Sequence, residues 1–121
     1  MAGMQVAVET VDRLCGEILN VLKETGEYEE TAILFTTDHG LPFPMMKCNL
    51  YDDGIGVAFL LRYPDMPEKH CVSDALLSQV DVFPTLCDIL KLEKPAWLQG
   101  ESFYPVIKGE RDKVHEASFT F

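Results

Sequence analysis

The sequence is poor in positive charge: ten lysines and arginines stand against twenty aspartates and glutamates, which gives a formal net charge of −10. This balance argues against nucleic acid and anionic membrane surfaces as partners, because both attract basic proteins. The sequence also lacks an apolar run of the roughly 20 residues that a membrane-spanning helix needs. We therefore expect neither a nucleic-acid partner nor a membrane partner.

The four cysteines form no C-x-x-C pair and no Cys/His cluster with zinc-finger spacing, which excludes the common structural zinc motifs. Cys15 and Cys87 lie in apolar helical contexts, so we expect them to be small core residues. No signal peptide is visible, and the cysteine pattern favours a reduced, cytoplasmic location for the chain as given.

The chain has 121 residues, 47% of them hydrophobic and 25% charged, which is typical of one soluble domain. We expect that domain to span residues 1–121 and to be α/β, with a mostly parallel sheet flanked by helices. Hydrophobic periodicity and turn residues predict the following elements: a helix over 6–25 ended by Gly26, a buried strand over 31–37, a turn at 52–54 and a strand over 55–63, a helix over 82–90 with Asp81 as its N-cap, a short helix over 102–108, and a strand over 114–121.

The strand over 31–37 ends in the run Asp38-His39-Gly40. In open α/β sheets ligands bind at the carboxyl ends of the strands. A carboxylate and an imidazole at this position, followed by the cation of Lys47, therefore suggest a divalent metal and an anionic substrate. Asp-His-Gly is also good turn chemistry, because Asp bonds its own backbone and Gly tolerates a positive φ, and this alternative stays open.

Other candidates have plainer interpretations. Lys47 could be a solvated loop lysine, His70 is expected to face solvent, and His115 is expected to be structural. Trp97 could form a platform for a sugar ring, but an anchor over the core is the favoured interpretation. Phe43 and Tyr51 flank the candidate site and could line a sugar pocket.

Three motifs together carry a resemblance to a known family. T-T-D-H-G at 36–40 resembles the second metal-binding motif of sulfatases and of the wider alkaline-phosphatase superfamily. D-V-F-P-T-L at 81–86 resembles the D-x-x-P-T-L helix of sulfatases, and the stretch 100–110 resembles the segment that follows it. L-P-F-P and N-L-Y, at 41–44 and 49–51, are similar to the heparan N-sulfatase branch of the family.

The resemblance implies an alkaline-phosphatase-like sandwich and a hydrolase of sulfate esters or N-sulfates. It implies that Asp38 and His39 are metal ligands and that Lys47 is the catalytic cation that contacts the sulfate. The implied cofactor is a divalent metal, with Ca²⁺ favoured in this family and Mn²⁺ or Zn²⁺ left open because His39 supplies an imidazole. The implied substrate is a sulfated sugar or an aryl sulfate.

Two family features are missing from the 121 residues: the C-x-P-S-R context of the formylglycine nucleophile and the N-terminal Asp-Asp metal pair. We therefore expect a C-terminal-side fragment of a sulfatase catalytic domain that is inactive alone and binds metal weakly. A fragment of a phosphatase, phosphodiesterase or phosphonate hydrolase of the same superfamily, or a non-catalytic binding module, stays open. We also expect self-association through an exposed sheet edge, which sedimentation would detect.

Overall fold

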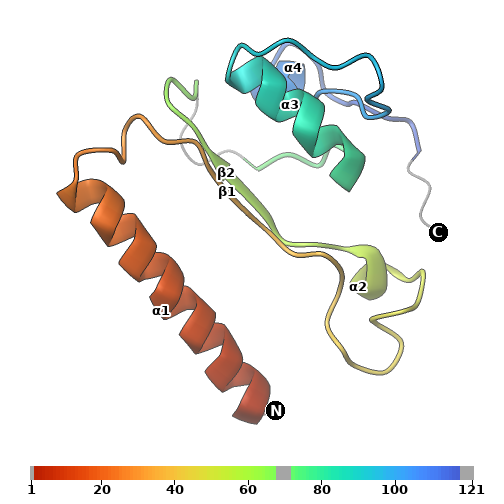
Figure 1. Ribbon diagram of the computed structural model, residues 1–121. Helices are drawn as coiled ribbons and strands as arrows, with labels where there is room; N and C mark the ends of the chain where they lie inside the picture. The colour runs from red at the N-terminus through yellow and green to blue at the C-terminus, as the bar shows by residue number, and fades with distance from the viewer. Residues whose placement is uncertain (1, 68–71, 118–121) are drawn as a thin grey trace. The chain divides into compact units, whose positions relative to one another are not determined.

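The computed structural model describes residues 2–67 and 72–117. The chain forms two compact units, and Figure 1 labels their helices and strands. Unit 1 combines Met1–Leu34 with Leu60–Pro64, and unit 2 combines Phe35–Phe59 with Asp65–Phe121. The expectation of a single domain over 1–121 stays a prediction.

The long helix of unit 1, α1, covers Ala2–Glu24 and so begins four residues earlier than expected. Its end confirms the prediction, because Gly26 has a φ of 78° and forms a two-bond helix cap. The Gly26 N–H donates to the carbonyl of Lys23 (3.2 Å) and the Glu27 N–H donates to the carbonyl of Leu22 (2.9 Å). This is a Schellman motif, in which glycine takes the left-handed position that closes the last turn.

The apolar stripe of α1 is formed as a helical face but is not buried among the described residues. Val11, Leu14, Ile18 and Val21, three or four residues apart, are all exposed. The hydrophobic period therefore predicted the helix correctly, and the apolar face of that helix is exposed in the described chain. No helix in the described part of the chain is long and apolar enough to cross a membrane.

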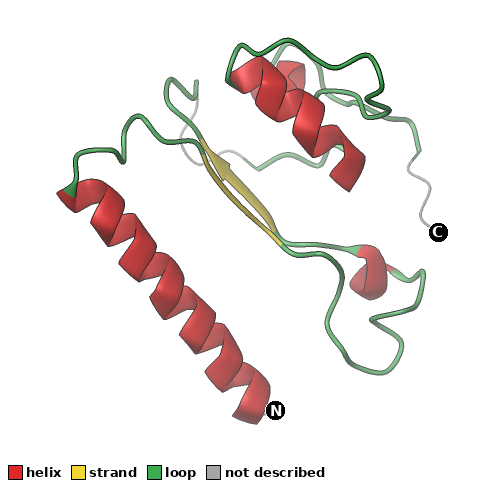
Figure 2. Cartoon of the chain, in the orientation of Figure 1, coloured by secondary structure: helices red, strands yellow, loops and turns green. Residues whose placement is uncertain are grey.

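The strands β1 (Ile33–Thr36) and β2 (Phe59–Arg62) pair with each other and make up the sheet of the described residues (Figure 2). They run antiparallel: the Thr37 N–H donates to the carbonyl of Ala58 (3.3 Å), and the Arg62 guanidinium reaches back to the carbonyl of Thr31 (3.2 Å). We expected a mostly parallel sheet, whereas the two strands that pair within the described residues are antiparallel. The expectation that β1 is buried on both faces was wrong, because its residues are half-buried or exposed.

The predicted turn at 52–54 is a short helix, α2, over Asp52–Ile55. The N–H of Ile55 donates to the carbonyl of Tyr51 (3.0 Å) and that of Gly56 to the carbonyl of Asp52 (2.7 Å). These bonds hold the backbone helical through Ile55, so the strand starts at Phe59 rather than at Ile55.

The core of unit 2 lies around α3, which covers Val82–Ile89 and follows the 3-10 turn η1 (Gln79–Asp81). The short helix α4 (Tyr104–Ile107) packs against α3. Thr85 is buried, and its hydroxyl donates to the carbonyl of Asp81 (2.7 Å) while accepting the N–H of Phe103 (2.9 Å). Cys87 is buried here, as expected, whereas Cys15 is half-buried.

Asp81 occupies the N-cap position of α3, but its carboxylate makes no cap hydrogen bond. It is 0% exposed and accepts three other bonds: from the N–H of Ser78 (2.8 Å), from the N–H of Glu101 (2.9 Å) and from Nε2 of His115 (2.8 Å). The predicted N-cap position is therefore confirmed, but the carboxylate caps η1, through the Ser78 N–H of a capping box, and not α3. Asp81 also joins three chain segments, and the structural role expected for His115 is confirmed.

Two further expectations differ from the structure. Trp97 is 73% exposed and stacks on Phe83, with ring centroids 6.1 Å apart, so it does not anchor a loop over the core. Residues 114–117 form no strand, and the rest of the strand predicted over 114–121 lies outside the described residues, as do His70 and Cys71.

Candidate functional site

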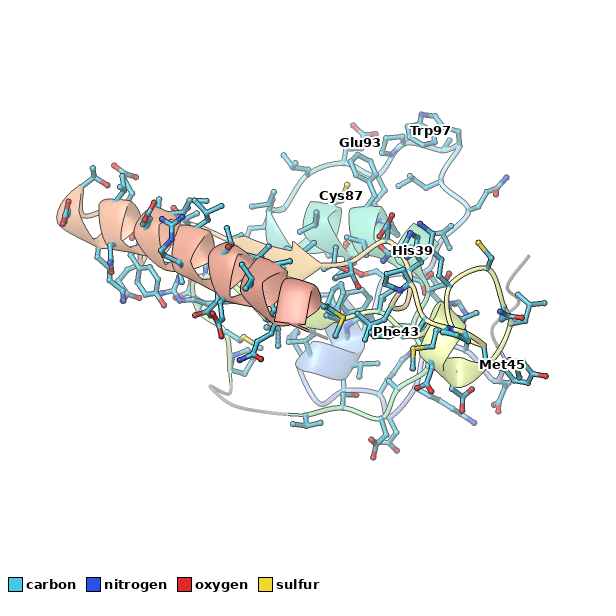
Figure 3. All side chains as sticks on the ribbon, turned by 90° about the horizontal axis from the view of Figure 1, so that it is seen from below. His39, Phe43, Met45, Cys87, Glu93 and Trp97 are labelled. Atoms are coloured by element: carbon cyan, nitrogen blue, oxygen red, sulfur yellow. The ribbon has the colours of Figure 1, made fainter. Side chains whose placement is uncertain are left out.

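The candidate site lies where β1 ends. The chain leaves the strand at Thr36, and Asp38 and His39 follow within three residues. Oδ2 of Asp38 lies 3.2 Å from Nε2 of His39, and the two side chains are 84% and 40% exposed. Figure 3 shows His39 next to the loop that carries Phe43 and Met45. The structure therefore brings the two predicted metal ligands together at an open surface.

The orientation of the His39 ring is fixed by the backbone. Nδ1 of His39 lies 2.8 Å from the carbonyl oxygen of Gly40. A carbonyl only accepts hydrogen bonds, so Nδ1 carries the proton and donates it. In the neutral ring, Nε2 is then left with its lone pair, which faces Asp38. A backbone carbonyl that sets the tautomer in this way is typical of metal-binding histidines.

Two electron-rich atoms thus face each other across 3.2 Å, and they repel unless a positive charge lies between them. A proton on His39 would supply it and form an ion pair. A divalent metal also fits the spacing, because two ligands about 2.0–2.4 Å from an ion and at right angles to each other lie about 3 Å apart. The donor set suits a metal, but it is partial: no group of three or more possible ligands occurs among the described residues.

Gly40 is required by close packing. Its N–H donates to the carbonyl of Gly54 (3.0 Å), and a Cβ at Gly40 would lie 1.9 Å from the carbonyl oxygen of Asp53. The φ of Gly40 is not positive; the residues of this loop with positive φ are Met45 (68°) and Cys48 (66°). The turn chemistry that we left open for Asp-His-Gly therefore does not explain this glycine. Gly40 is needed because a residue without a Cβ lets the site loop close against α2.

Lys47 lies on the same loop and is exposed. The backbone N–H of Lys47 donates to the carbonyl of Leu41 (3.0 Å), and this bond joins two parts of the loop. Within the described residues no ion pair involves Lys47. Its predicted contact with a sulfate group stays a prediction.

One residue beside the site was missed. The side-chain amide of Gln79 donates to the carbonyl of Thr37 (2.9 Å) and lies 3.3 Å from Oγ1 of Thr36. Gln79 thus contacts the backbone directly before Asp38, from a turn 42 residues further along the chain. Nothing in the sequence signals this contact, because a single glutamine before a helix is an ordinary surface residue.

A family model described as Sulfatase matches residues 4–92 of the chain. The match covers more than half of the 121 residues and includes both the Asp38-His39 motif and the start of α3. The chain belongs to the sulfatase family. This confirms the family resemblance and the fold class that the motifs implied.

Curated relatives of this sulfatase chain include the ulvan-active sulfatase of Formosa agariphila, with 34% identity over 112 residues. Human N-sulphoglucosamine sulphohydrolase is 30% identical over 120 residues. The alignments cover 92% and 91% of this chain but only 19% and 24% of those proteins. The chain therefore spans about a fifth of the length of the sulfatases that it matches.

Solved structures agree with this assignment. A protein in complex with its substrate D-glucosamine-2-N,6-O-disulfate matches with a TM-score of 0.73 and 29% identity, over 90% of this chain and 23% of that one. The phosphonate monoester hydrolase of Silicibacter pomeroyi matches with a TM-score of 0.71 and 29% identity, over 90% and 22%. The backbone of this sulfatase chain is thus shared with an enzyme of the wider superfamily.

Proposed function

We propose that this chain supplies the second metal-binding motif of a sulfatase that hydrolyses sulfate esters or N-sulfates of a sugar. The observation that carries the proposal is the pairing of the Asp38 carboxylate with Nε2 of His39, whose lone pair is aimed by the Gly40 carbonyl. The substrate complex of one structural relative and the names of the curated relatives support sulfated sugars as the substrate class.

The roles of the residues follow from their chemistry. Asp38 contributes a hard anionic oxygen and His39 a nitrogen ligand, and Lys47 neutralises charge on the sulfate oxygens as the ester bond breaks. Asp38 and His39 would hold a divalent metal, which would polarise the sulfate group and stabilise the developing charge. Because the C-x-P-S-R nucleophile context is not present in the sequence, the chain alone performs no turnover.

Metal binding by the chain alone is expected to be weak, because Ca²⁺ takes about 6–8 oxygen ligands and this motif supplies two side chains. Calorimetry should give a dissociation constant for Ca²⁺ well above the micromolar range. Mn²⁺, which broadens NMR signals of nearby atoms, should broaden Asp38 and His39 selectively. Asp38→Asn should abolish this broadening, and Asp12→Asn, the same change at an exposed position of α1, should leave it intact.

Two results would contradict different parts of the proposal. Micromolar or tighter Ca²⁺ binding together with turnover of an aryl sulfate above background would overturn the inactivity of the chain alone, and would require a nucleophile that we have not identified. Mn²⁺ broadening that is equal in wild type and Asp38→Asn would overturn the metal role, and would leave Asp38 and His39 as an ordinary surface pair.

A phosphonate or phosphate ester hydrolase is the second candidate, favoured by the structural match to the phosphonate monoester hydrolase and by the imidazole of His39. Nitrogen ligands suit Mn²⁺ and Zn²⁺ better than Ca²⁺. Mn²⁺ or Zn²⁺ binding at Asp38 and His39 that is far tighter than Ca²⁺ binding would favour this candidate. Comparable weak binding of all three ions would favour the sulfatase.

A further inference from the structure

We propose that Gln79 is a positioning residue for the metal-binding pair: its side-chain amide holds the end of β1 so that Asp38 and His39 leave the strand in a fixed direction. This inference rests on the proposed function of that pair. It starts from two contacts, because Nε2 of Gln79 donates to the carbonyl of Thr37 (2.9 Å) and lies 3.3 Å from Oγ1 of Thr36.

Thr37 directly follows β1, which ends at Thr36, and precedes Asp38. Its N–H donates to the carbonyl of Ala58 (3.3 Å), and its Oγ1 accepts the N–H of Ala58 (3.1 Å). These two bonds involve the N–H and the hydroxyl of Thr37. Its carbonyl accepts the hydrogen bond from Gln79. The three bonds together hold the peptide unit that leads into Asp38.

The next backbone bond along the chain is that of Gly40 to Gly54. Asp38 and His39 therefore lie on a short span with a fixed point at each end: Thr37 on one side and Gly40 on the other. A short span clamped at both ends limits the directions in which its side chains leave the backbone. Such preorganisation reduces the ordering cost when the two ligands bind an ion.

Gln79 is exposed, and a flexible exposed glutamine would position little. Its backbone, however, belongs to η1, which the buried carboxylate of Asp81 holds by bonds to Ser78 and Glu101. Gly100 lets the loop approach: a Cβ there would lie 2.0 Å from the carbonyl oxygen of Val80. The side-chain amide of Gln79 therefore reaches the end of β1 from η1, a turn that other bonds hold in place.

The test replaces Gln79 by methionine, which keeps the length and neutrality of the side chain but cannot donate a hydrogen bond. In Gln79→Met, the dissociation constant for Mn²⁺ at Asp38 and His39 should rise by about threefold to tenfold, the value of about one hydrogen bond. Without metal, amide hydrogen exchange at Thr37 and Gly40, whose N–H groups bond the carbonyls of Ala58 and Gly54 at the two ends of the span, should quicken by a similar factor. Gln79→Asn, whose amide is one methylene too short, should behave like Gln79→Met.

The matched control is Gln5→Met, which removes an exposed glutamine amide that bonds Glu9 on α1 (3.0 Å). It should change neither the Mn²⁺ dissociation constant nor the exchange rates at the site. A purely structural role for Gln79 predicts a different result: a lower midpoint of urea unfolding in Gln79→Met, with Mn²⁺ binding and local exchange at the site unchanged. That result would overturn the inference. Equal Mn²⁺ binding and equal amide exchange in Gln79→Met and Gln5→Met would overturn it as well.

The experiment separates this inference from the proposed function. Wild-type protein without any selective Mn²⁺ effect at Asp38 and His39 would overturn the metal role of the pair. The metal-free exchange rates would still decide on Gln79: faster exchange in Gln79→Met would support its hold on the strand end, and unchanged exchange would overturn it.

Discussion

Asp38 and Asp81 are two aspartates of the same unit with opposite surroundings. The side chain of Asp38 is 84% exposed and lies 3.2 Å from Nε2 of His39. Asp81 is 0% exposed and accepts hydrogen bonds from Ser78, Glu101 and His115. The carboxylate oxygens of Asp38 are accessible to a ligand, whereas those of Asp81 are already hydrogen-bonded inside the protein.

Burial and the number of hydrogen-bond donors distinguish a carboxylate that can bind a ligand from a structural one. Burying a carboxylate is costly unless several donors compensate it, so the three bonds of Asp81 are the condition of its burial. The exposed carboxylate of Asp38 has no burial cost to offset, and it does not need the three donors that Asp81 has. It stands beside a ring whose lone pair points at it, an arrangement that a cation would stabilise.

The largest effect is expected at the buried carboxylate. Asp81→Ala leaves two backbone N–H groups and the His115 ring without their acceptor, so the free energy of unfolding should fall by about 3 kcal/mol or more. Loss of a simple helix cap costs about 1 kcal/mol. Urea unfolding followed by circular dichroism measures the difference. A loss of 1 kcal/mol or less would mean that Asp81 contributes no more than a simple helix cap.

The control for that experiment is Asp38→Ala, which removes the exposed carboxylate. It should change the free energy of unfolding by less than about 0.5 kcal/mol, as surface substitutions do. A loss comparable to that of Asp81→Ala would mean that Asp38 is a structural residue, and the contrast between the two aspartates would disappear.

A smaller effect is expected at the glycine that closes the site loop. Gly40→Ala places a methyl group about 1.9 Å from the Asp53 carbonyl oxygen, so the loop must shift, at a cost of about 1–3 kcal/mol. Selective Mn²⁺ broadening at Asp38 and His39 should be lost with it. Urea unfolding and NMR on the same samples measure both effects.

Gly16→Ala is the matched change, because a Cβ at this helical position meets nothing within 4 Å. It should raise the free energy of unfolding by about 0.5–1 kcal/mol, the helix propensity of alanine over glycine. The two substitutions should therefore act with opposite signs. A stabilising Gly40→Ala would show that the site loop is not closed against α2.

The sequence predicted what depends on local pattern. The end of α1 at Gly26, the start of α3 and the pairing of Asp38 with His39 all follow from neighbouring residues. It failed where distant segments decide: the acceptor role of Asp81 depends on Glu101 and His115, which lie 20 and 34 residues away. No local pattern encodes such contacts.

The same distinction explains the exposed apolar residues. Periodicity predicted the stripe of α1 correctly, but burial depends on what covers it, and the chain spans about a fifth of its relatives' length. Trp97 is a similar case: its position between Pro95 and Gly100 favoured a loop anchor over the core, yet here it stacks on Phe83 at the surface. Composition cannot tell these outcomes apart.

Asp88 is a third carboxylate whose surroundings lie between those of Asp81 and Asp38, since its side chain is 28% exposed. Burial acts to raise the pKa of Asp88, but hydrogen bonds from Lys94 and Ser102 and the charge of Lys94 outweigh it and lower the pKa below its ordinary value. Because folding favours the ionised form, the resulting stabilisation is present above the unfolded pKa, near 3.9. It is lost as the pH falls through the lower pKa of the folded state.

Asp88→Asn should therefore cost about 0.5–1 kcal/mol at pH 7, less than Asp81→Ala and more than Asp38→Ala. Wild type and variant should converge in urea unfolding as the pH falls below about 4, and added salt should shrink the gap at pH 7 because the Asp88–Lys94 pair (2.7 Å) is partly exposed to solvent. A gap that persisted unchanged at low pH would mean that Asp88 contributes through packing rather than through its charge. Burial and donor count would then no longer order the three aspartates by their effect on stability.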